Sequence, residues 1–196
     1  PPTLEETLLP DGLINSTIEP ESGWNYEIGS RGQLFKNTVY FDIAIYRMNV
    51  KNLLVARRTN NDEYMGVNAG KTQYNGLEFT LKNTFIKTKN ITLFGFHSFA
   101  FNDFKFKKFI DDSNDYSNNL LTGVPKLTYN ATIGLESLNG FYTSVNYSFV
   151  GEIPLRDDNS VYSDEYQIIN TQFGYQSNTN NNFQYNFLVG INNLTN

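Results

Sequence analysis

Short segments in which apolar and polar residues alternate dominate this sequence. Residues 141–149 read Phe-Tyr-Thr-Ser-Val-Asn-Tyr-Ser-Phe, and residues 183–191 read Phe-Gln-Tyr-Asn-Phe-Leu-Val-Gly-Ile. Because successive side chains of a strand point to opposite faces, such a segment has one apolar and one polar face. Eight segments of this kind are predicted as strands, at 24–32, 38–55, 73–86, 90–104, 124–137, 141–151, 166–176 and 182–192.

The connections between these strands alternate between short and long. The short ones are 33–37, 87–89, 138–140 and 177–181, and the long ones are 57–72, 105–123 and 152–165. In an antiparallel meander every second connection lies at the same end, so all the long connections gather on one rim. This sorting is typical of outer-membrane β-barrels. We therefore predict an all-β fold, an antiparallel transmembrane β-barrel wall of about eight meander strands.

The alternation also assigns the two faces of the wall. The apolar set, which we expect on the convex face toward lipid, is Val39, Phe41, Ile43, Leu77, Phe79, Leu81, Ile133, Val145 and Phe173. The polar set, which we expect on the concave interior, is Asp42, Glu78, Lys82, Thr132 and Asn146. In a small soluble barrel or sandwich the apolar set would point inward instead, so alternation alone leaves both architectures open.

Composition argues against several functional classes. The net charge of −5 argues against a nucleic-acid-binding surface. The chain has no Cys and one His, His97, so thiol chemistry is excluded and a serine triad would need His97 as its base. No Gly-x-Ser-x-Gly or phosphate-loop pattern occurs. We expect no enzyme activity, no metal site and no cofactor.

Five short motifs, spread over nearly the whole chain, have the order found in one protein family. They are PTLEE at 2–6, IEPE at 18–21 with NYEIG at 25–29, NAG at 68–70 with GLE at 76–78, VPK at 124–126, and GINNL at 190–194. In these motifs the chain resembles the C-terminal part of TonB-dependent outer-membrane receptors. These are plugged, 22-stranded barrels that import scarce nutrients.

The resemblance implies a place in the family's architecture. Residues 1–196 would form one partial barrel domain, approximately the fourteenth to twenty-first strands, lacking the plug, the TonB box and the last strand. It implies the outer membrane of a Gram-negative cell, with the long loops outside and the short turns in the periplasm. The implied partners are TonB with its inner-membrane motor, acting through the plug, together with lipid, lipopolysaccharide and the imported ligand. No nucleic-acid partner is expected.

Three arginines on long connections are the candidate ligand-binding residues, namely Arg57, Arg58 and Arg156. Arginine binds carboxylate and phosphate oxygens through a two-pronged fork, and ferric chelates are often anionic. The stretch Val55-Ala56-Arg57-Arg58, followed by the NAG motif, resembles iron-chelate receptors more than the glycan-importing branch, so the expected ligand is a ferric siderophore or another iron chelate. The alternatives are a glycan-importing receptor of the family, a small structural or adhesive outer-membrane barrel, and a soluble carbohydrate-binding β module.

Overall fold

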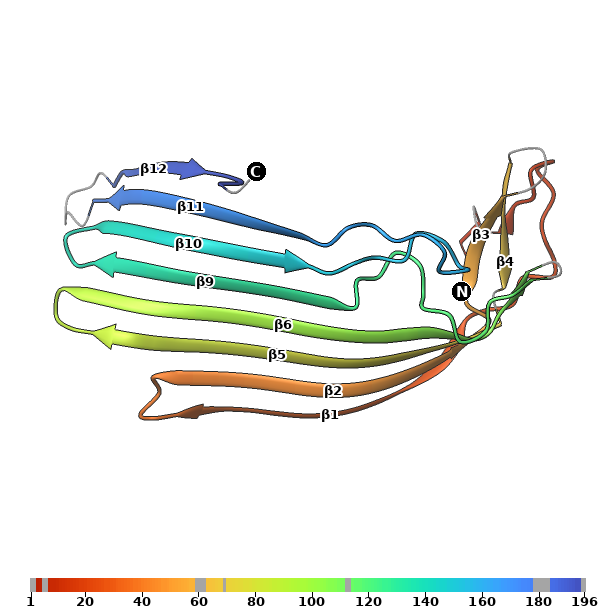
Figure 1. Cartoon of the computed structure of the whole chain (residues 1–196), viewed down its shortest axis with the longest axis horizontal. Helices are drawn as coiled ribbons and strands as arrows, with labels where there is room; N and C mark the ends of the chain where they lie inside the picture. The colour runs from red at the N-terminus through yellow and green to blue at the C-terminus, as the bar shows by residue number, and fades with distance from the viewer. Residues whose placement is uncertain are drawn as a thin grey trace.

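One antiparallel sheet of eight strands dominates the structure, a computed structural model that describes residues 3–4, 7–58, 63–68, 70–111, 114–177 and 184–194. The strands lie in the order β1-β2-β5-β6-β9-β10-β11-β12, so each pairs with its neighbours along the chain (Figure 1). They are β1 (Ser22–Leu34), β2 (Val39–Lys51), β5 (Lys71–Lys87), β6 (Ile91–Lys108), β9 (Leu127–Ser137), β10 (Phe141–Val150), β11 (Tyr166–Gln176) and β12 (Asn186–Ile191). The predicted all-β meander is confirmed.

The sheet is open rather than closed on itself. Within the described residues, β1 pairs with β2 and β12 pairs with β11, and these two strands form the two edges of the sheet. A small closed barrel would join its first strand to its last, and a sandwich would stack two sheets. The described architecture therefore favours a segment of a larger wall over both of those alternatives. Among the described residues there is no helix long and apolar enough to cross a membrane.

The long connections gather at one end of the sheet and the short turns at the other, as predicted (Figure 1). Two of the long connections carry small hairpins. One consists of β3 (Leu54–Arg58) and β4 (Tyr64–Asn68), and the other of β7 (Ile110–Asp111) and β8 (Asn114–Asp115). Figure 1 shows the first hairpin beyond the end of the sheet. These connections are therefore structured extensions of the wall.

Three predicted strand boundaries were wrong at the long-connection end. The predicted strand 38–55 ends at Lys51, because Asn52 adopts a positive φ of 60° that breaks the extended chain. The predicted strand 124–137 begins at Leu127, after Pro125, which has no N–H to donate. The predicted strand 90–104 continues to Lys108, because β6 stays paired with β5 through Phe106 and Thr72. At the other end of the chain, β12 is shorter than the predicted 182–192, of which residues 182–183 lie outside the described part.

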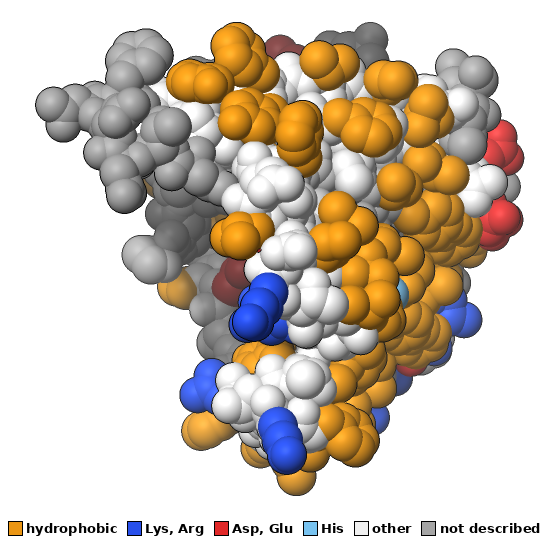
Figure 2. All heavy atoms as spheres, turned by 90° about the vertical axis from the view of Figure 1, so that its left-hand side faces the viewer, with side chains coloured by type: hydrophobic (Ala, Val, Ile, Leu, Met, Phe, Trp, Pro, Cys, Tyr) orange, Lys and Arg blue, Asp and Glu red, His pale blue; other side chains and the backbone are white. Residues whose placement is uncertain are grey.

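The strand register confirms that the two predicted sets lie on opposite faces. Residues directly opposite each other on antiparallel strands share a face. Ile45 pairs with Ile28 and Leu77, and Leu77 pairs with Phe101, whereas Ala44 pairs with Glu78. We call these the apolar face and the polar face. Viewed along the strands from the turn end, apolar side chains gather along one side of the sheet (Figure 2).

Aromatic side chains on the polar face cover glycines of the neighbouring strands. The ring of Tyr46 lies over Gly76, that of Phe94 over Gly134, and that of Tyr142 over Gly174, so closely that a Cβ on any of these glycines would clash. Covering a strand glycine with a cross-strand aromatic ring restores packing that the missing side chain cannot supply. This explains why the apolar side chain of Phe94 lies on the polar face.

Candidate functional site at the long-connection end

A small apolar cluster fixes the second long connection, 109–126, to the end of β6. Phe106, Phe109 and Leu121 are buried, with exposed fractions of 3%, 5% and 7%. Their partners Leu53, Val55, Tyr74, Phe104 and Tyr116 pack around them. The ring centroids of Phe106 and Phe109 lie 4.7 Å apart. Because Phe106 pairs with Thr72, this cluster lies on the polar face, so the connection folds over the side of the wall predicted to face the interior.

Residues 118–121, which precede β9 in the chain, pair with the part of β6 that extends past the first residue of β9. The N–H of Phe106 donates to the carbonyl of Asn119 at 3.0 Å, and the N–H of Leu121 donates to the carbonyl of Phe104 at 2.9 Å. Lys105 and Leu120 form an antiparallel bridge. The protruding end of β6 thereby gains hydrogen-bond partners on the side that β9 does not reach, which leaves fewer unpaired backbone groups there.

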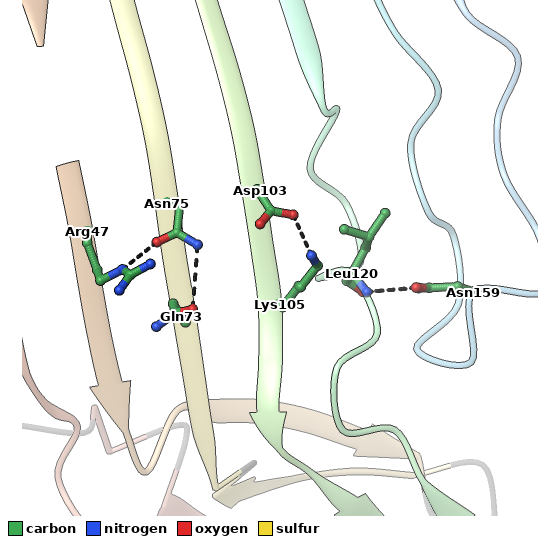
Figure 3. A network of polar contacts seen from close by, with 7 residues as sticks. All are labelled: Arg47, Gln73, Asn75, Asp103, Lys105, Leu120 and Asn159. Carbon is green, nitrogen blue, oxygen red and sulfur yellow. Dashed lines mark hydrogen bonds and ion pairs between the residues drawn. The ribbon is translucent and has the colours of Figure 1, made fainter. Parts of the chain in front are cut away.

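The third connection, 151–165, is attached to the second by asparagine side chains. Asn159 Oδ1 accepts a hydrogen bond from the N–H of Leu120 at 2.7 Å (Figure 3), and its Nδ2 donates to the carbonyl of Leu120 at 3.0 Å. Asn119 Nδ2 donates to the carbonyl of Asp157 at 2.8 Å. The N–H of Gly123 also donates to the carbonyl of Pro154 at 2.9 Å. The two connections therefore form one continuous surface.

The first connection, 52–70, is attached to the segment that precedes β1. Asn68 Oδ1 accepts from the N–H of Glu19 at 2.9 Å, and Asn68 Nδ2 donates to the carbonyls of Glu19 and Asn52 at 3.0 and 2.8 Å. Glu21 Oε1 accepts from the N–H of Leu54 at 2.7 Å. These bonds join the IEPE and NAG motifs, so the two motifs have a shared structural role.

The backbone conformation at position 70, the last residue of the NAG motif, requires a glycine. Its φ is +78°, in the left-handed region, and an added Cβ would lie 2.2 Å from the carbonyl oxygen of Lys108. A side chain would meet both the conformational penalty and a backbone clash. The close approach lets the start of β5 meet the end of β6 directly beneath the hairpin.

The three candidate arginines lie at this end of the sheet but on two separate connections. Arg57 and Arg58 belong to β3, where their backbones pair with Met65 and Tyr64. Their side chains lie outside the described part of the chain. Arg156 is exposed, and its carbonyl accepts a hydrogen bond from the N–H of Asn159 at 2.9 Å. In the sheet order β6 and β9 separate the two connections. Contact between these three arginines and a ligand stays a prediction.

The local charges at this end are mixed. A cavity of about 620 Å³ between the sheet and the second and third connections is lined by Phe101, Leu127, Phe149 and Tyr162, with Lys126, Glu152 and Glu165 also on its wall. Hydrogen bonds from the hydroxyl and the N–H of Ser160 hold the pKa of the exposed Asp158 carboxyl below its usual value. The strand register places Phe101, Leu127 and Phe149, three residues of the cavity wall, on the apolar face of the sheet.

His97, the single histidine, lies on the apolar face. Its Nδ1 is 2.8 Å from the hydroxyl of Tyr129, and the two rings are stacked. Within the described ranges no group of three His, Asp or Glu side chains is arranged to hold a metal ion. His97 thus has a place in the packing of β6 against β9.

The sequence did not reveal the residues that organise the connections. Asn119 and Asn159 are two among many asparagines, and nothing in their neighbourhood distinguished them from ordinary turn residues. Asn68 stood out as the first residue of the NAG motif, but the motif did not indicate which backbone groups it would bond. The apolar cluster left a usable signal, since Phe106 and Phe109 interrupt the lysines of a segment expected as loop. Aromatic residues inside a charged loop indicate burial.

Comparison with known families gives one clear match. The model of the family described as TonB dependent receptor-like, beta-barrel, matches residues 1–194. This match covers almost the whole chain.

Solved structures share the fold at low sequence identity. The ferric preacinetobactin receptor BauA of Acinetobacter baumannii has a TM-score of 0.66 and 16% identity, over 96% of this chain and 27% of that one. The ferric-catecholate import receptor Fiu of E. coli K12 has a TM-score of 0.64 and 18% identity, over 92% and 24%. The copper transporter OprC has a TM-score of 0.67 and 15% identity, over 94% and 27%. The chain thus spans about a quarter of each of these proteins.

Proposed function

Because the chain belongs to the TonB-dependent receptor β-barrel family, we propose that its sheet is part of the wall of an outer-membrane receptor that imports a scarce nutrient. TonB-dependent receptors are transporters and receptors of the outer membrane. Within such a barrel the chain would supply approximately the fourteenth to twenty-first strands. The observation that carries this proposal is the apolar face, where the described apolar side chains are exposed or half-exposed.

The exposed apolar residues argue for a lipid contact. Ile28, Ile45, Ile133, Phe173 and Val189 are exposed by 76%, 53%, 52%, 56% and 67% of their surfaces. A soluble protein rarely leaves so wide an apolar patch in water, because burying each apolar side chain would stabilise the folded state by about 1.5–3 kcal/mol. In a membrane wall this face meets hydrocarbon, while the polar face meets a hydrated interior. The long connections then lie outside the cell and the short turns in the periplasm.

We infer further that the ligand is an iron chelate. The ferric receptors that share the fold support this, and the copper transporter shows that the same fold is compatible with another metal cargo. Arg57, Arg58 and Arg156 would contact the anionic groups of the chelate from two sides of the mouth. The bonds between the second and third connections would hold Arg156 in place before the ligand arrives, which lowers the entropy lost on binding.

Energy coupling would come from outside these strands. In the proposed receptor a plug fills the barrel, and TonB, driven by the inner-membrane motor, acts on the plug to open a path for the ligand. The wall contributes a rigid frame and three of the connections that surround the mouth.

Uptake by living cells tests the proposal. A strain lacking the intact receptor would be complemented with it and given radiolabelled ferric catecholate, ferric hydroxamate, cupric ion or a labelled oligosaccharide. We expect uptake of at least one ferric chelate, and we expect removal of TonB to abolish that uptake. Uptake of the oligosaccharide or of copper alone would contradict the iron assignment. Uptake that does not depend on TonB would contradict the transport mechanism.

A further inference from the structure

Lys82 of β5 lies between two aromatic side chains on the polar face of the sheet. In the strand register Lys82 is directly opposite Tyr40 of β2 and Phe96 of β6. The Nζ atom of Lys82 lies 5.7 Å from the ring centroid of Tyr40 and 5.8 Å from that of Phe96. Separations within about 6 Å allow a cation–π attraction to each ring. The two rings therefore hold the ammonium group from the strands on either side of β5.

Across the described ranges, no carboxylate lies within ion-pair distance of Lys82. The neighbouring acid on this face is Asp42, whose Oδ2 accepts a hydrogen bond from the hydroxyl of Tyr40 at 3.2 Å. Asp42 also lies directly opposite Arg31 of β1, so a second cation shares its charge. Glu78 is further along β5, about 13 Å away at the usual rise of a strand. The positive charge of Lys82 is therefore available to an anion from outside the sheet.

A hollow of about 300 Å³ lies beside Lys82, and its wall includes Thr38, Tyr40, Phe94 and Phe96. Tyr40, Lys82 and Phe96 form one row of the polar face, so the hollow opens toward the interior of the proposed barrel. Its volume is at the lower end of the range for small-molecule sites, so it fits one ring group rather than a whole chelate. The aromatic walls favour a planar ring, and the ammonium group favours a negative oxygen on that ring.

The hollow lies toward the turn end of the sheet, away from the candidate arginines. Lys82 is close to the turn end of β5, which is at Lys87. The hairpin strand β3, which carries Arg57 and Arg58, lies beyond the other end of the sheet (Figure 1). In the proposed receptor the turn end is periplasmic. A ligand that has left the mouth would therefore pass this hollow before its release into the periplasm.

We propose that the hollow at Lys82 is a transit site, which binds an anionic aromatic ring of the ligand during its passage along the interior wall. The ring would pack on Phe96 while its negative oxygens contact Nζ of Lys82. Lys82 is exposed, so this charged contact is weak. Weak binding suits a site that must release its ligand as well as capture it. The inference rests on the proposed function, since it requires the polar face to line the path of the ligand.

Binding of a small aromatic anion tests the inference in the intact receptor in detergent. The probe is 4-fluorosalicylate, followed by fluorine NMR, and every sample has the three candidate arginines changed to Ala so that the mouth does not contribute. We expect Lys82→Gln to weaken probe binding about fivefold, as for the loss of one exposed charged contact. Phe96→Leu should weaken it about threefold, because one ring contact is lost. The matched control is Lys36→Gln, which removes an exposed charge at the turn end and should bind like the parent.

Three outcomes would overturn the inference. The first is the absence of saturable probe binding by the parent, and a lower melting temperature of Lys82→Gln would then assign Lys82 to contact with a carboxylate of the plug. The second is an equal loss in Lys82→Gln and in the control. The third is equal competition by cyclohexanecarboxylate, which has the charge without the aromatic ring and would indicate a general anion contact.

Uptake of ferric chelate by cells separates this inference from the proposed function, because uptake does not depend on the salicylate titration. Chelate uptake by a receptor that does not bind the probe at Lys82 overturns the transit site alone. Probe binding at Lys82 in a receptor that takes up no ferric chelate overturns the assignment of the ligand as an iron chelate alone.

Discussion

The side-chain amide of Asn159 forms two hydrogen bonds with the backbone of Leu120, 39 residues earlier in the chain. The amide accepts from the Leu120 N–H and donates to the Leu120 carbonyl, which is what the backbone of a neighbouring strand would do. The third connection therefore continues the wall beyond β9 without forming a strand of its own. Asn159 can hold this position because asparagine tolerates its positive φ of 54°.

Removal of the Asn159 amide is expected to release the third connection from the second. Asn159→Gly keeps the backbone conformation accessible and deletes both bonds, so we expect a loss of about 1–3 kcal/mol in the local free energy of opening. Asn159→Asp retains the acceptor for the Leu120 N–H and should lose less. Hydrogen exchange of the Leu120 amide measures the effect. Unchanged protection in Asn159→Gly would show that the connection is held by other contacts.

A side chain at Gly70 is expected to separate β5 from β6 at the base of the hairpin. Gly70→Ala meets the left-handed penalty, about 1–3 kcal/mol, and also a clash with the Lys108 carbonyl. Gly123→Ala is the matched control, because Gly123 has a φ of +82° and open space around it. Thermal unfolding of the intact receptor in detergent should show the larger loss at Gly70. Equal losses at the two sites would mean that the clash is relieved by a small shift of the backbone.

The Asp158 carboxyl gives the third connection a pH dependence of known sign. Its pKa is lowered by the hydrogen bonds from Ser160, so the stabilisation is present above the unfolded-state pKa and is lost as the pH falls through the lowered pKa. The carboxyl is exposed, so the effect is small. Ser160→Ala should raise the pKa of Asp158 toward its usual value, as measured by NMR titration of the carboxyl. An unchanged pKa would assign the effect to other groups.

Loss of the hairpin arginines is expected to weaken binding of an anionic ferric chelate. A hydrogen bond to a charged group contributes about 1.5–3 kcal/mol, so Arg57→Ala with Arg58→Ala should reduce affinity more than about tenfold. Lys87→Ala with Lys89→Ala, at the turn end, is the matched control. Titrations at two salt concentrations distinguish direct contact from long-range attraction, which salt would screen. An unchanged dissociation constant at both concentrations would remove these arginines from the site.

The sequence predicted the sheet well because a half-polar wall imposes a period of two on every strand. Val145 and Ile133 face each other across β9 and β10 on the apolar face, as their alternation indicated. The strand ends were harder to predict, because tertiary contacts determine them. The hairpin β3–β4 was missed since the stretch from Leu53 to Ala56 reads as a continuation of β2, and only the left-handed Asn52 interrupts it.

The loop surface was predictable only in outline. The lengths of the connections placed Arg156 and the hairpin arginines at one end of the wall. The bonds that give this end its shape come from asparagines such as Asn68 and Asn159, whose partners lie far away in the sequence. A turn asparagine and an asparagine that bonds to a distant backbone look the same in a single sequence.

The orientation of the two faces is the central claim, and spin labelling tests it most directly. Residues 1–196 contain no Cys, so a single Cys substitution can carry one nitroxide label once any Cys elsewhere in the intact receptor has been replaced by Ser. The intact receptor would be reconstituted in lipid vesicles, and the label's exposure to oxygen and to a water-soluble nickel chelate would be compared. Apolar-face labels should favour oxygen and polar-face labels should favour nickel, whereas a reversed pattern or water exposure on both faces would contradict a lipid-facing wall. The labelled positions are Phe79, Ile133 and Val145 on the apolar face, and Thr80, Thr132 and Asn146 on the polar face.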